Sequence, residues 1–453
     1  MKKLCLSALC ALMSIVAVCA QSDDDFFFDD DLFADDVVVT TSENSSSSSD
    51  LKHGVLFENG SVKLGGSIDT SLGLIVPLYV ADSSDTSLGD NIYSSTLTPT
   101  ADALLYVDAR PTQNLRLYTK FGWKYPYQQA VAIPEIPLGM FSIPYIPLGS
   151  FGTFYVKELF TDFSVADRVF FRFGQHTVSW GTGYFFSPVS DMINSSAVDP
   201  ENPTAQVNGA LNLRAQIVFP GTQNCLWAYI VPASSGNARD TALAAKGEFV
   251  VGGWELGAGA LYKYQTAPKV MFTASGSLFS GKVAVFCETV LQYGTQTEWS
   301  ADADSWEDKT FTVQATAGTS YTWKDPQITV MAQYLFDSNK DDHQYLSYGN
   351  NLALTVLFSK VGTEKLSANL MGLFYFNKDA VDMSNASASN SYLTLATNGI
   401  AFMPYSVIAS ASLSYNPVKN ISVSAGPYFT WQSFSTNPDV SFKLTATLGG
   451  GSF

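Results

Sequence analysis

The chain has 453 residues, of which 13% are aromatic and only 15% are charged. A soluble domain has about 25% charged residues. The formal net charge of −16 at pH 7 excludes a nucleic-acid-binding protein, which would be basic. Beyond residue 20, no apolar run approaches the ~20 residues that a membrane-spanning helix needs. Scarce charge and abundant aromatic residues instead favour a β-barrel whose outer face meets lipid.

The first 20 residues have the pattern of a secretory signal peptide. Lys2 and Lys3 precede an apolar stretch, and Val18 and Ala20 occupy the −3 and −1 positions of a cleavage site. A lipid anchor at Cys19 is the alternative, although such a site prefers a residue smaller than valine before the cysteine.

Three of the 5 cysteines lie in this signal, which leaves Cys225 and Cys287 in the exported chain. Two cysteines can form one bridge, but they are not a disulfide framework. We favour the interpretation that they are isolated residues of the barrel wall.

Residues 21–52 are acidic and rich in serine, with ten acidic residues between Asp23 and Asp50 and no lysine or arginine there. Such a composition cannot bury enough apolar surface to fold alone, which predicts a disordered periplasmic segment before a barrel at 53–453. The alternative is a short docking motif for a periplasmic partner. Its aromatic anchors would be Phe26, Phe27, Phe28 and Phe33.

From about residue 60 onward, apolar and polar residues alternate with a period of two, as in β-strands. Short links such as 110–114, with Pro and Asn, alternate with mostly longer ones such as 125–151. The pattern predicts an all-β fold, a transmembrane antiparallel up-and-down barrel of about 18 strands (range 14 to 18). A soluble β-sandwich is the structural alternative, but the polar strand face suits a water-filled lumen better than a dry core.

The last strand also indicates a barrel, because an aromatic residue, Phe453, ends the chain. This ending resembles the signal read by the barrel-assembly machinery, although Gly449 to Gly451 interrupt the alternation. We therefore expect that machinery and outer-membrane lipid as partners, and the bacterial outer membrane as the location.

Basic residues of neighbouring predicted strands share the polar face. The predicted pore-lining residues are Arg116, Lys120, Lys124, Arg168, Arg172 and Arg214. A basic ladder on one wall of a lumen favours anions or polar solutes. The alternative is that these charges pair with inward acids, such as Glu158 or Asp162, and only solvate the wall.

Two long links are candidates for a pore constriction. In the first, residues 133–151 contain a ten-residue near-duplication whose prolines exclude a central strand. This apolar segment either narrows the barrel mouth or binds a hydrophobic ligand. The second link is rich in Ser, Asn, Asp and Pro. The constriction residues singled out are Pro134, Pro137, Pro144, Pro147, Asp191 and Asn194.

Residues 168–204 carry the most distinctive motif, in which "FRFGQ", "SWG" and "SP" precede an Asp and an "IN" pair. This segment resembles a strand and loop of porin-type barrels, including alginate-export-like families. The resemblance covers about 35 residues and departs from the family pattern at His176. It implies a pore-lining strand followed by a loop, from Gly181 to Pro203, that lines or narrows the pore.

Enzymatic chemistry has little support, because the exported chain has only His53, His176 and His343. On one predicted strand, His176 and Ser179 would point to opposite faces, which prevents a catalytic pair. The acids Asp341 and Asp342 beside His343 are typical of a solvated loop. We expect no enzyme activity, no metal site and no cofactor.

These features predict an outer-membrane porin, through which small polar solutes diffuse past a loop-constricted lumen. The alternatives are a transporter of hydrophobic small molecules, similar in kind to fatty-acid transporters, and a surface adhesin or structural barrel. An ion-conducting lumen separates the first from the adhesin, and saturable binding of an apolar ligand identifies the transporter.

Overall fold

The computed structural model describes the chain from residue 57, with gaps. The described ranges are 57–79, 95–126, 136–138, 141–143, 153–166, 168–205, 207–233, 236–302, 305–324, 326–339, 349–376, 405–418, 421–432 and 438–452. The predicted signal peptide, the acidic segment and Phe453 lie outside these residues.

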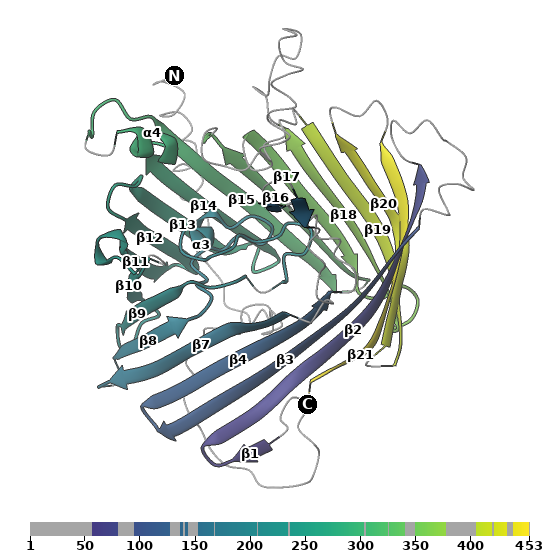
Figure 1. Cartoon of the computed structure of the whole chain (residues 1–453), viewed down its shortest axis with the longest axis horizontal. Coiled ribbons are helices and arrows are strands. Elements are labelled where there is room, and N and C mark those ends of the chain that lie inside the picture. The colour runs from purple at the N-terminus through teal and green to yellow at the C-terminus, as the bar shows by residue number, and fades with distance from the viewer. Residues whose placement is uncertain are drawn as a thin grey trace.

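Eighteen antiparallel strands close into one barrel, because the first, β2, pairs with the last, β21 (Figure 1). The strands are β2 (Val62–Tyr79), β3 (Thr96–Thr112), β4 (Leu115–Pro126), β7 (Thr153–Val165), β8 (Val169–Gln175), β9 (Leu211–Val218), β10 (Cys225–Val231), β11 (Ala242–Val251), β12 (Trp254–Tyr262), β13 (Lys269–Leu278), β14 (Val283–Tyr293), β15 (Phe311–Lys324), β16 (Gln327–Asp337), β17 (Gly349–Phe358), β18 (Leu366–Phe376), β19 (Tyr405–Val418), β20 (Ile421–Gln432) and β21 (Asp439–Ser452). This confirms the predicted fold class and strand number.

Three short strands lie beside this barrel sheet or outside it. The strand β1 (Phe57–Asn59) pairs with the start of β2. The strands β5 (Ile136–Leu138) and β6 (Phe141–Ile143) form a separate two-stranded sheet.

The described helices are α3 (Pro188–Asp191), α4 (Gln296–Ala301) and the 3-10 turn η2 (Ala238–Asp240). Among the described residues, no helix is long and apolar enough to cross a membrane.

The links between strands alternate in length along the chain, as the sequence predicts. At one end of the barrel they are tight: Gly252 and Gly253 alone join β11 to β12, with φ of 59° and 81°. Two successive positive φ angles define a turn that matches the strand twist and favours glycine. At the other end, two links are short, near 266–267 and 435–437, and they join β12 to β13 and β20 to β21.

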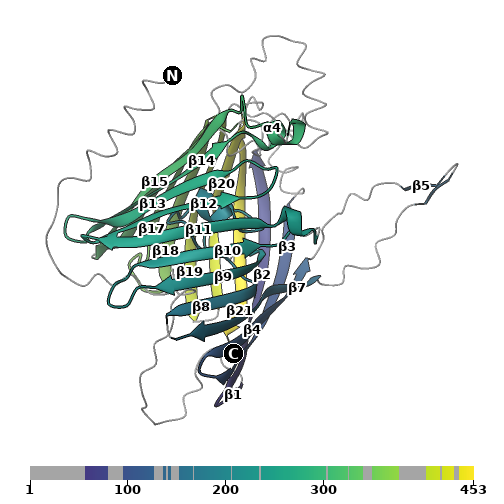
Figure 2. The same cartoon turned by 90° about the vertical axis from the view of Figure 1, so that its left-hand side faces the viewer.

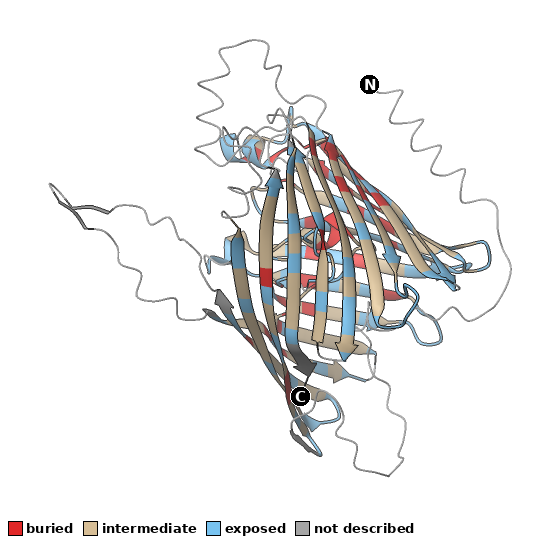
Figure 3. Ribbon diagram, turned by 90° about the vertical axis from the view of Figure 1, so that its right-hand side faces the viewer, coloured by how far each residue is buried: buried red, intermediate tan, exposed pale blue. Residues whose placement is uncertain are grey.

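The outer face of the barrel is apolar, and its exposed positions alternate with less exposed ones along the strands (Figure 3). Exposed aromatic side chains lie near both ends of the barrel. At the short-turn end these are Phe163, Phe219, Phe249, Phe279, Trp323 and Tyr415; at the other end they are Trp123, Phe154, Tyr262, Phe311, Phe376 and Trp431. Two aromatic girdles around an apolar band are typical of a barrel in a bilayer.

The barrel wall is low at β8, β9 and β10, which have 7, 8 and 7 residues, whereas β2 has 18 (Figure 2). Near the end of β8, Gly174 has a φ of +140°, and a Cβ there would lie 2.1 Å from the carbonyl oxygen of Leu159. Only glycine fits this position. The chain leaves the wall here and enters the lumen.

Candidate pore constriction

Residues 176–210 form a segment, here called the strap, that lies inside the barrel and includes α3 (Figure 1). Alternation along the sequence predicts that His176 and Ser179 lie on one strand. This prediction is wrong, because β8 ends at Gln175 and both residues belong to the strap. The helix α3 packs against β13, β14 and β15.

Two apolar clusters fix the strap against the inner wall. In the first, Val178, Trp180, Val189 and Ile193 pack against inward residues of β10 to β14. Those wall residues are Tyr229, Ala244, Leu261, Met271 and Val290. Their chain neighbours, such as Ile230 and Tyr262, are exposed on the outside, so the strap covers the lumen face.

The second cluster continues around the wall, where Phe185 and Phe186 pack against β16, β17 and β18. The wall residues are Leu335, Ala353, Leu373 and Tyr375. Burying one large apolar side chain stabilises by roughly 1.5–3 kcal/mol. The two clusters therefore hold the strap strongly to the inner wall.

The carboxylate of Glu288 on β14 is buried under the strap and accepts hydrogen bonds from four strap groups. The backbone N–H groups of Thr182 and Gly183 donate to it, as do that of Val189 at 3.1 Å and the hydroxyl of Ser187 at 3.3 Å. A buried carboxylate needs such donors to offset its lost hydration.

The glycines of the "WGTG" motif make this close approach possible. A Cβ at Gly181 would lie 2.4 Å from Glu288 Oε1, and one at Gly183 would lie 1.9 Å from the carbonyl oxygen of Phe186. The motif thus serves to bring the strap backbone onto the wall carboxylate.

Three further wall residues tie the strap down. Gln333 on β16 accepts from the N–H of Phe185 at 2.7 Å and donates to the carbonyl of Phe186 at 2.6 Å. Lys246 on β11 donates to the carbonyl of Trp180 at 2.6 Å. On β20, the hydroxyl of Tyr428 donates to Glu201 Oε2 at 3.0 Å. The anchors lie on β11, β14, β16 and β20, so the strap extends from the β8–β9 wall to the β20 wall.

We expect that Gln333→Leu loosens the middle of the strap without unfolding the barrel. The substitution leaves the N–H groups of Tyr184 and Phe185 without their acceptor, and each such loss costs about 1–3 kcal/mol. Hydrogen exchange of these amides should accelerate at least about tenfold. The matched control is Gln327→Leu, at an exposed position of the same strand. Unchanged exchange would show that Gln333 is not an anchor.

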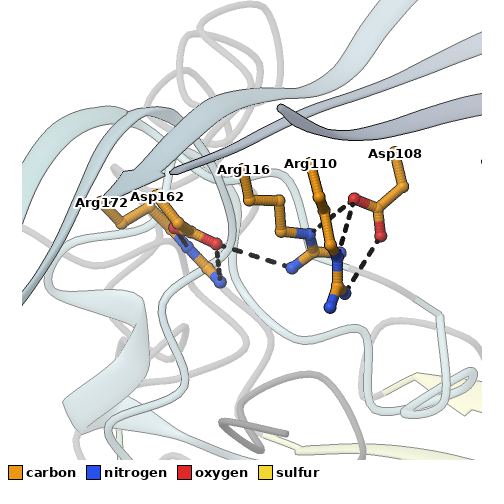
Figure 4. Close-up of polar contacts among 5 residues, drawn as sticks. All are labelled: Asp108, Arg110, Arg116, Asp162 and Arg172. Atoms are coloured by element: carbon orange, nitrogen blue, oxygen red, sulfur yellow. Dashed lines mark hydrogen bonds and ion pairs between the residues drawn. The ribbon is translucent and has the colours of Figure 1, made fainter. Parts of the chain in front are cut away.

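Two residues of the predicted basic ladder, Arg116 and Arg172, form ion pairs with carboxylates (Figure 4). Arg172 donates to both oxygens of Asp162, at 2.6 and 3.1 Å. Arg116 lies between the two carboxylates, with Nε 3.0 Å from Asp108 and NH1 3.5 Å from Asp162. Arg110 contacts Asp108 at 3.3 Å. Three guanidinium groups thus share two carboxylates, an excess of positive charge in this cluster.

Cross-strand register explains why these residues meet. Arg116 on β4 pairs with Asp162 on β7, which pairs with Arg172 on β8, and Arg172 pairs with Arg214 on β9. Aromatic rings support the guanidinium groups: Arg172 lies 4.1 Å from the Phe160 ring centroid and Arg214 lies 5.0 Å from that of Trp227. Stacking fixes the orientation of the charged groups.

The other predicted pore-lining residues are placed differently. Lys124 lies 3.8 Å from Asp102, with its side chain 59% exposed, and Lys120 pairs in register with Glu158. Arg168 is not in a strand: it lies exposed in the turn that precedes β8.

Strict alternation does not predict the inward position of Lys157. A β-bulge on β7 sets Glu158 opposite Lys120 and Val156 opposite Phe121, which leaves Lys157 as the extra residue. The charged groups that act on it include Glu158 and Asp102, which attract it, and Lys120, which repels it. The bulge therefore places two charged neighbours on the same side of the wall.

His176 is buried and has the surroundings of a packing residue, not of a catalytic one. It is 1% exposed, and its Nδ1 lies 3.3 Å from the carbonyl oxygen of Gly174. Burial, together with Arg172 and Arg214, lowers its pKa to about 3, so the ring is neutral at pH 7. Ser179 is exposed, and no hydrogen bond joins it to His176 within the described chain.

The predicted constriction residues of the strap have distinct surroundings. Asn194 bridges the backbone of Val178, accepting from its N–H and donating to its carbonyl, each at 2.8 Å. Asp191 accepts from the N–H of Val198 at 3.3 Å. Asn194 thus shapes the strap itself.

Asp191 gives the strap a predicted pH dependence. Burial, with the nearby carboxylate of Glu288, raises its pKa from 3.8 to about 7 although the N–H of Val198 opposes the shift. The docked pKa exceeds the unfolded one, so this group's stabilisation is full at low pH and is lost as pH rises through about 7. Strap-opening events in single-channel records should increase as pH rises from about 4 to about 7, between the pKa of the released carboxyl and that of the docked one, and should level off above that. Asp191→Asn should abolish that increase, whereas more opening at acidic pH would contradict this assignment.

The first predicted constriction, in the link at 125–151, is only partly within the described chain. Pro137 lies in β5, whereas Pro134, Pro144 and Pro147 lie outside the described residues, as do His53 and the segment with Asp341, Asp342 and His343.

Cys225 on β10 and Cys287 on β14 are both free, with three strands between them. Among the described residues, no group of three or more His, Cys, Asp or Glu could hold a metal ion.

Comparison with solved structures supports the fold. A scan of protein-family descriptions and a search of curated sequences found no match. Among solved structures, OccK2 (OpdF) of Pseudomonas aeruginosa, in complex with glucuronate, is 10% identical, with 86% of this chain and 98% of that one covered and a TM-score of 0.51. A BenF-like porin of Pseudomonas fluorescens Pf-5 is 8% identical, with coverages of 86% and 98% and a TM-score of 0.51. OccAB4 of Acinetobacter baumannii is 8% identical, with coverages of 87% and 99% and a TM-score of 0.50.

The closed barrel, its apolar outer face and the strap inside it define a class of protein. The chain has the fold of an outer-membrane porin-type barrel with a loop folded into the lumen.

Proposed function

We propose that this protein is an outer-membrane channel through which small polar solutes diffuse, with the strap as its constriction. One observation carries the proposal: a 35-residue segment, 176–210, is fixed inside a closed barrel by charged and polar wall residues. A loop that narrows the lumen turns a wide pore into a selective one.

The uncovered part of the lumen wall supports a preference for anions. The apolar clusters of the strap cover inner faces of β10 to β14 and β16 to β18. The basic cluster lies on β3, β4, β7 and β8, where the side chains of Arg110 and Arg116 are 50% and 29% exposed. Accessible guanidinium groups in a lumen attract negatively charged solutes.

The proposal also includes the two ends of the chain. Residues 1–20 act as the signal peptide, residues 21–52 form the periplasmic segment, and Phe26 to Phe28 with Phe33 offer a docking motif. The barrel-assembly machinery inserts the barrel at 53–453. The protein uses no cofactor and catalyses no reaction, as the channel fold of its structural neighbours supports.

Single-channel recording of the purified barrel in a planar bilayer tests the function. We expect steady current steps and a reversal potential that indicates anion preference in a salt gradient. The alternative of a surface adhesin predicts a closed lumen, and hydrophobic transport predicts little ion current. A folded, inserted barrel that does not conduct would therefore refute the channel.

A further inference from the structure

The outer face of β8 to β12, here called the low face, lies on the side of the barrel where the wall is shortest (Figure 2). Three of its strands, β8, β9 and β10, have 7, 8 and 7 residues. A tilted strand needs about 9–11 residues to cross the hydrocarbon core of a bilayer. Lipid that meets the low face must therefore thin locally, which costs free energy. A protein that covers this face removes that cost.

A row of small side chains crosses the low face. Four alanines, one on each strand from β9 to β12, are successive cross-strand partners: Ala215, Ala228, Ala245 and Ala260. They point outward, because their chain neighbours Tyr229, Ala244 and Leu261 are buried against the strap. Small residues let packed membrane-spanning segments approach closely and so increase their van der Waals contact. The row is therefore a flat strip against which a second flat surface can pack.

The charge and the size of the low face suit contact with an identical face. Every outward position of β9 to β12, from Leu211 to Tyr262, is uncharged, so two copies meet without repulsion. Strands lie about 4.8 Å apart and rise about 3.3 Å per residue, so five strands of about eight residues offer roughly 600 Å². Two copies would together bury about 1,200 Å², which reaches the range of stable protein interfaces.

We propose that the low face is the contact between copies of this chain in the outer membrane. A second copy lies at the same depth in the bilayer and presents an equally short wall, so one contact covers both short walls. Inward residues of the same strands, such as Tyr229 and Leu261, hold the strap. The contact therefore also braces the wall to which the strap is fixed.

Cysteine cross-linking of the full-length barrel in lipid vesicles tests the contact. Cys225→Ser/Cys287→Ser removes the two free cysteines, and Ala245→Cys then places a thiol within the row. The matched control is Ala411→Cys on β19, an outward position on the opposite side of the barrel (Figure 1). With a short bis-maleimide, we expect at least about tenfold more cross-linked dimer from Ala245→Cys than from the control.

A bulky substitution beside the thiol gives a second, independent measurement, with heat-modifiable migration on gels as the check of folding. Added to Ala245→Cys, the substitution Ala260→Trp should reduce the dimer at least about tenfold, because an indole in the row holds the copies apart. Ala446→Trp, at an outward position of β21, should leave the dimer unchanged.

Three outcomes overturn the contact. Absence of dimer from Ala245→Cys means that lipid covers the low face, and equal dimer from Ala411→Cys means that the barrels collide at random. In native outer membranes, a cross-link from Ala245→Cys to a protein of another mass means that a different protein covers the face. Cross-linking does not measure transport, so each of these outcomes leaves the proposed channel intact.

Discussion

Replacing Glu288 with leucine is expected to release the strap and to raise single-channel conductance at least about twofold. The substitution removes the acceptor of four strap donors, on Thr182, Gly183, Val189 and Ser187. Each unsatisfied buried donor costs about 1–3 kcal/mol, so the total loss is several kcal/mol. Leucine is close to glutamate in volume, so the effect comes from lost hydrogen bonds and not from steric expulsion. Conductance in planar bilayers measures the outcome.

A control substitution at another glutamate distinguishes release of the strap from general damage to the barrel. Glu364 is exposed at a short turn, with its side chain 89% accessible, and Glu364→Leu should leave conductance unchanged. Glu288→Gln keeps one side-chain oxygen as an acceptor and should fall between the wild type and the leucine variant. If folded Glu288→Leu barrels conduct like the wild type, the strap is not the constriction.

The strand pattern of this barrel can be predicted from the sequence, because each strand has one face in lipid and one in the lumen, and this constrains the polarity of each residue locally. Residues 115–124 alternate in polarity since each strand has one face in lipid and one in the lumen. Tight links such as Gly252–Gly253 mark the hairpins for the same local reason. The range of 14 to 18 strands allowed for two doubtful hairpins, and the barrel has 18 strands.

The anchors of the strap could not be predicted in this way. Glu288 and Gln333 lie about 100 and 150 positions beyond the strap residues they bind, and only closure of the barrel brings them together. The available signal was indirect, since both are polar residues on inward faces of otherwise apolar strands. The alternation after Gln175 also misled the prediction for His176 and Ser179, because the backbone at Gly174 turns the chain into the lumen.

The basic ladder was predicted in outline. The lumen side of Arg116, Arg172 and Arg214 follows from parity, but their partners depend on cross-strand register. Sequence alternation named Asp162 as a possible counter-charge and missed Asp108, which lies on the preceding strand. In the cluster of Arg110, Arg116 and Arg172 with Asp108 and Asp162, the charges are paired, and the guanidinium groups outnumber the carboxylates by one.

Replacing Arg116 and Arg172 together with glutamine is expected to shift selectivity towards cations. In the wild type, three guanidinium groups share Asp108 and Asp162. The double variant leaves Arg110 as the only guanidinium of this cluster, so the local charge changes sign. Because lumen charges set potentials of several kT, the permeability ratio should change several-fold. Reversal potentials in a salt gradient measure the ratio.

The opposite substitution provides the sharpest control for this ladder. Asp162→Asn removes a carboxylate from between Arg116 and Arg172 and should increase anion preference. The shifts should shrink at about 1 M salt, where the Debye length falls to about 3 Å, and grow at low salt. If the arginine and aspartate variants move the reversal potential in the same direction, altered pore shape is the cause. Opposite shifts that both weaken with salt would identify the field of this cluster as the source of selectivity.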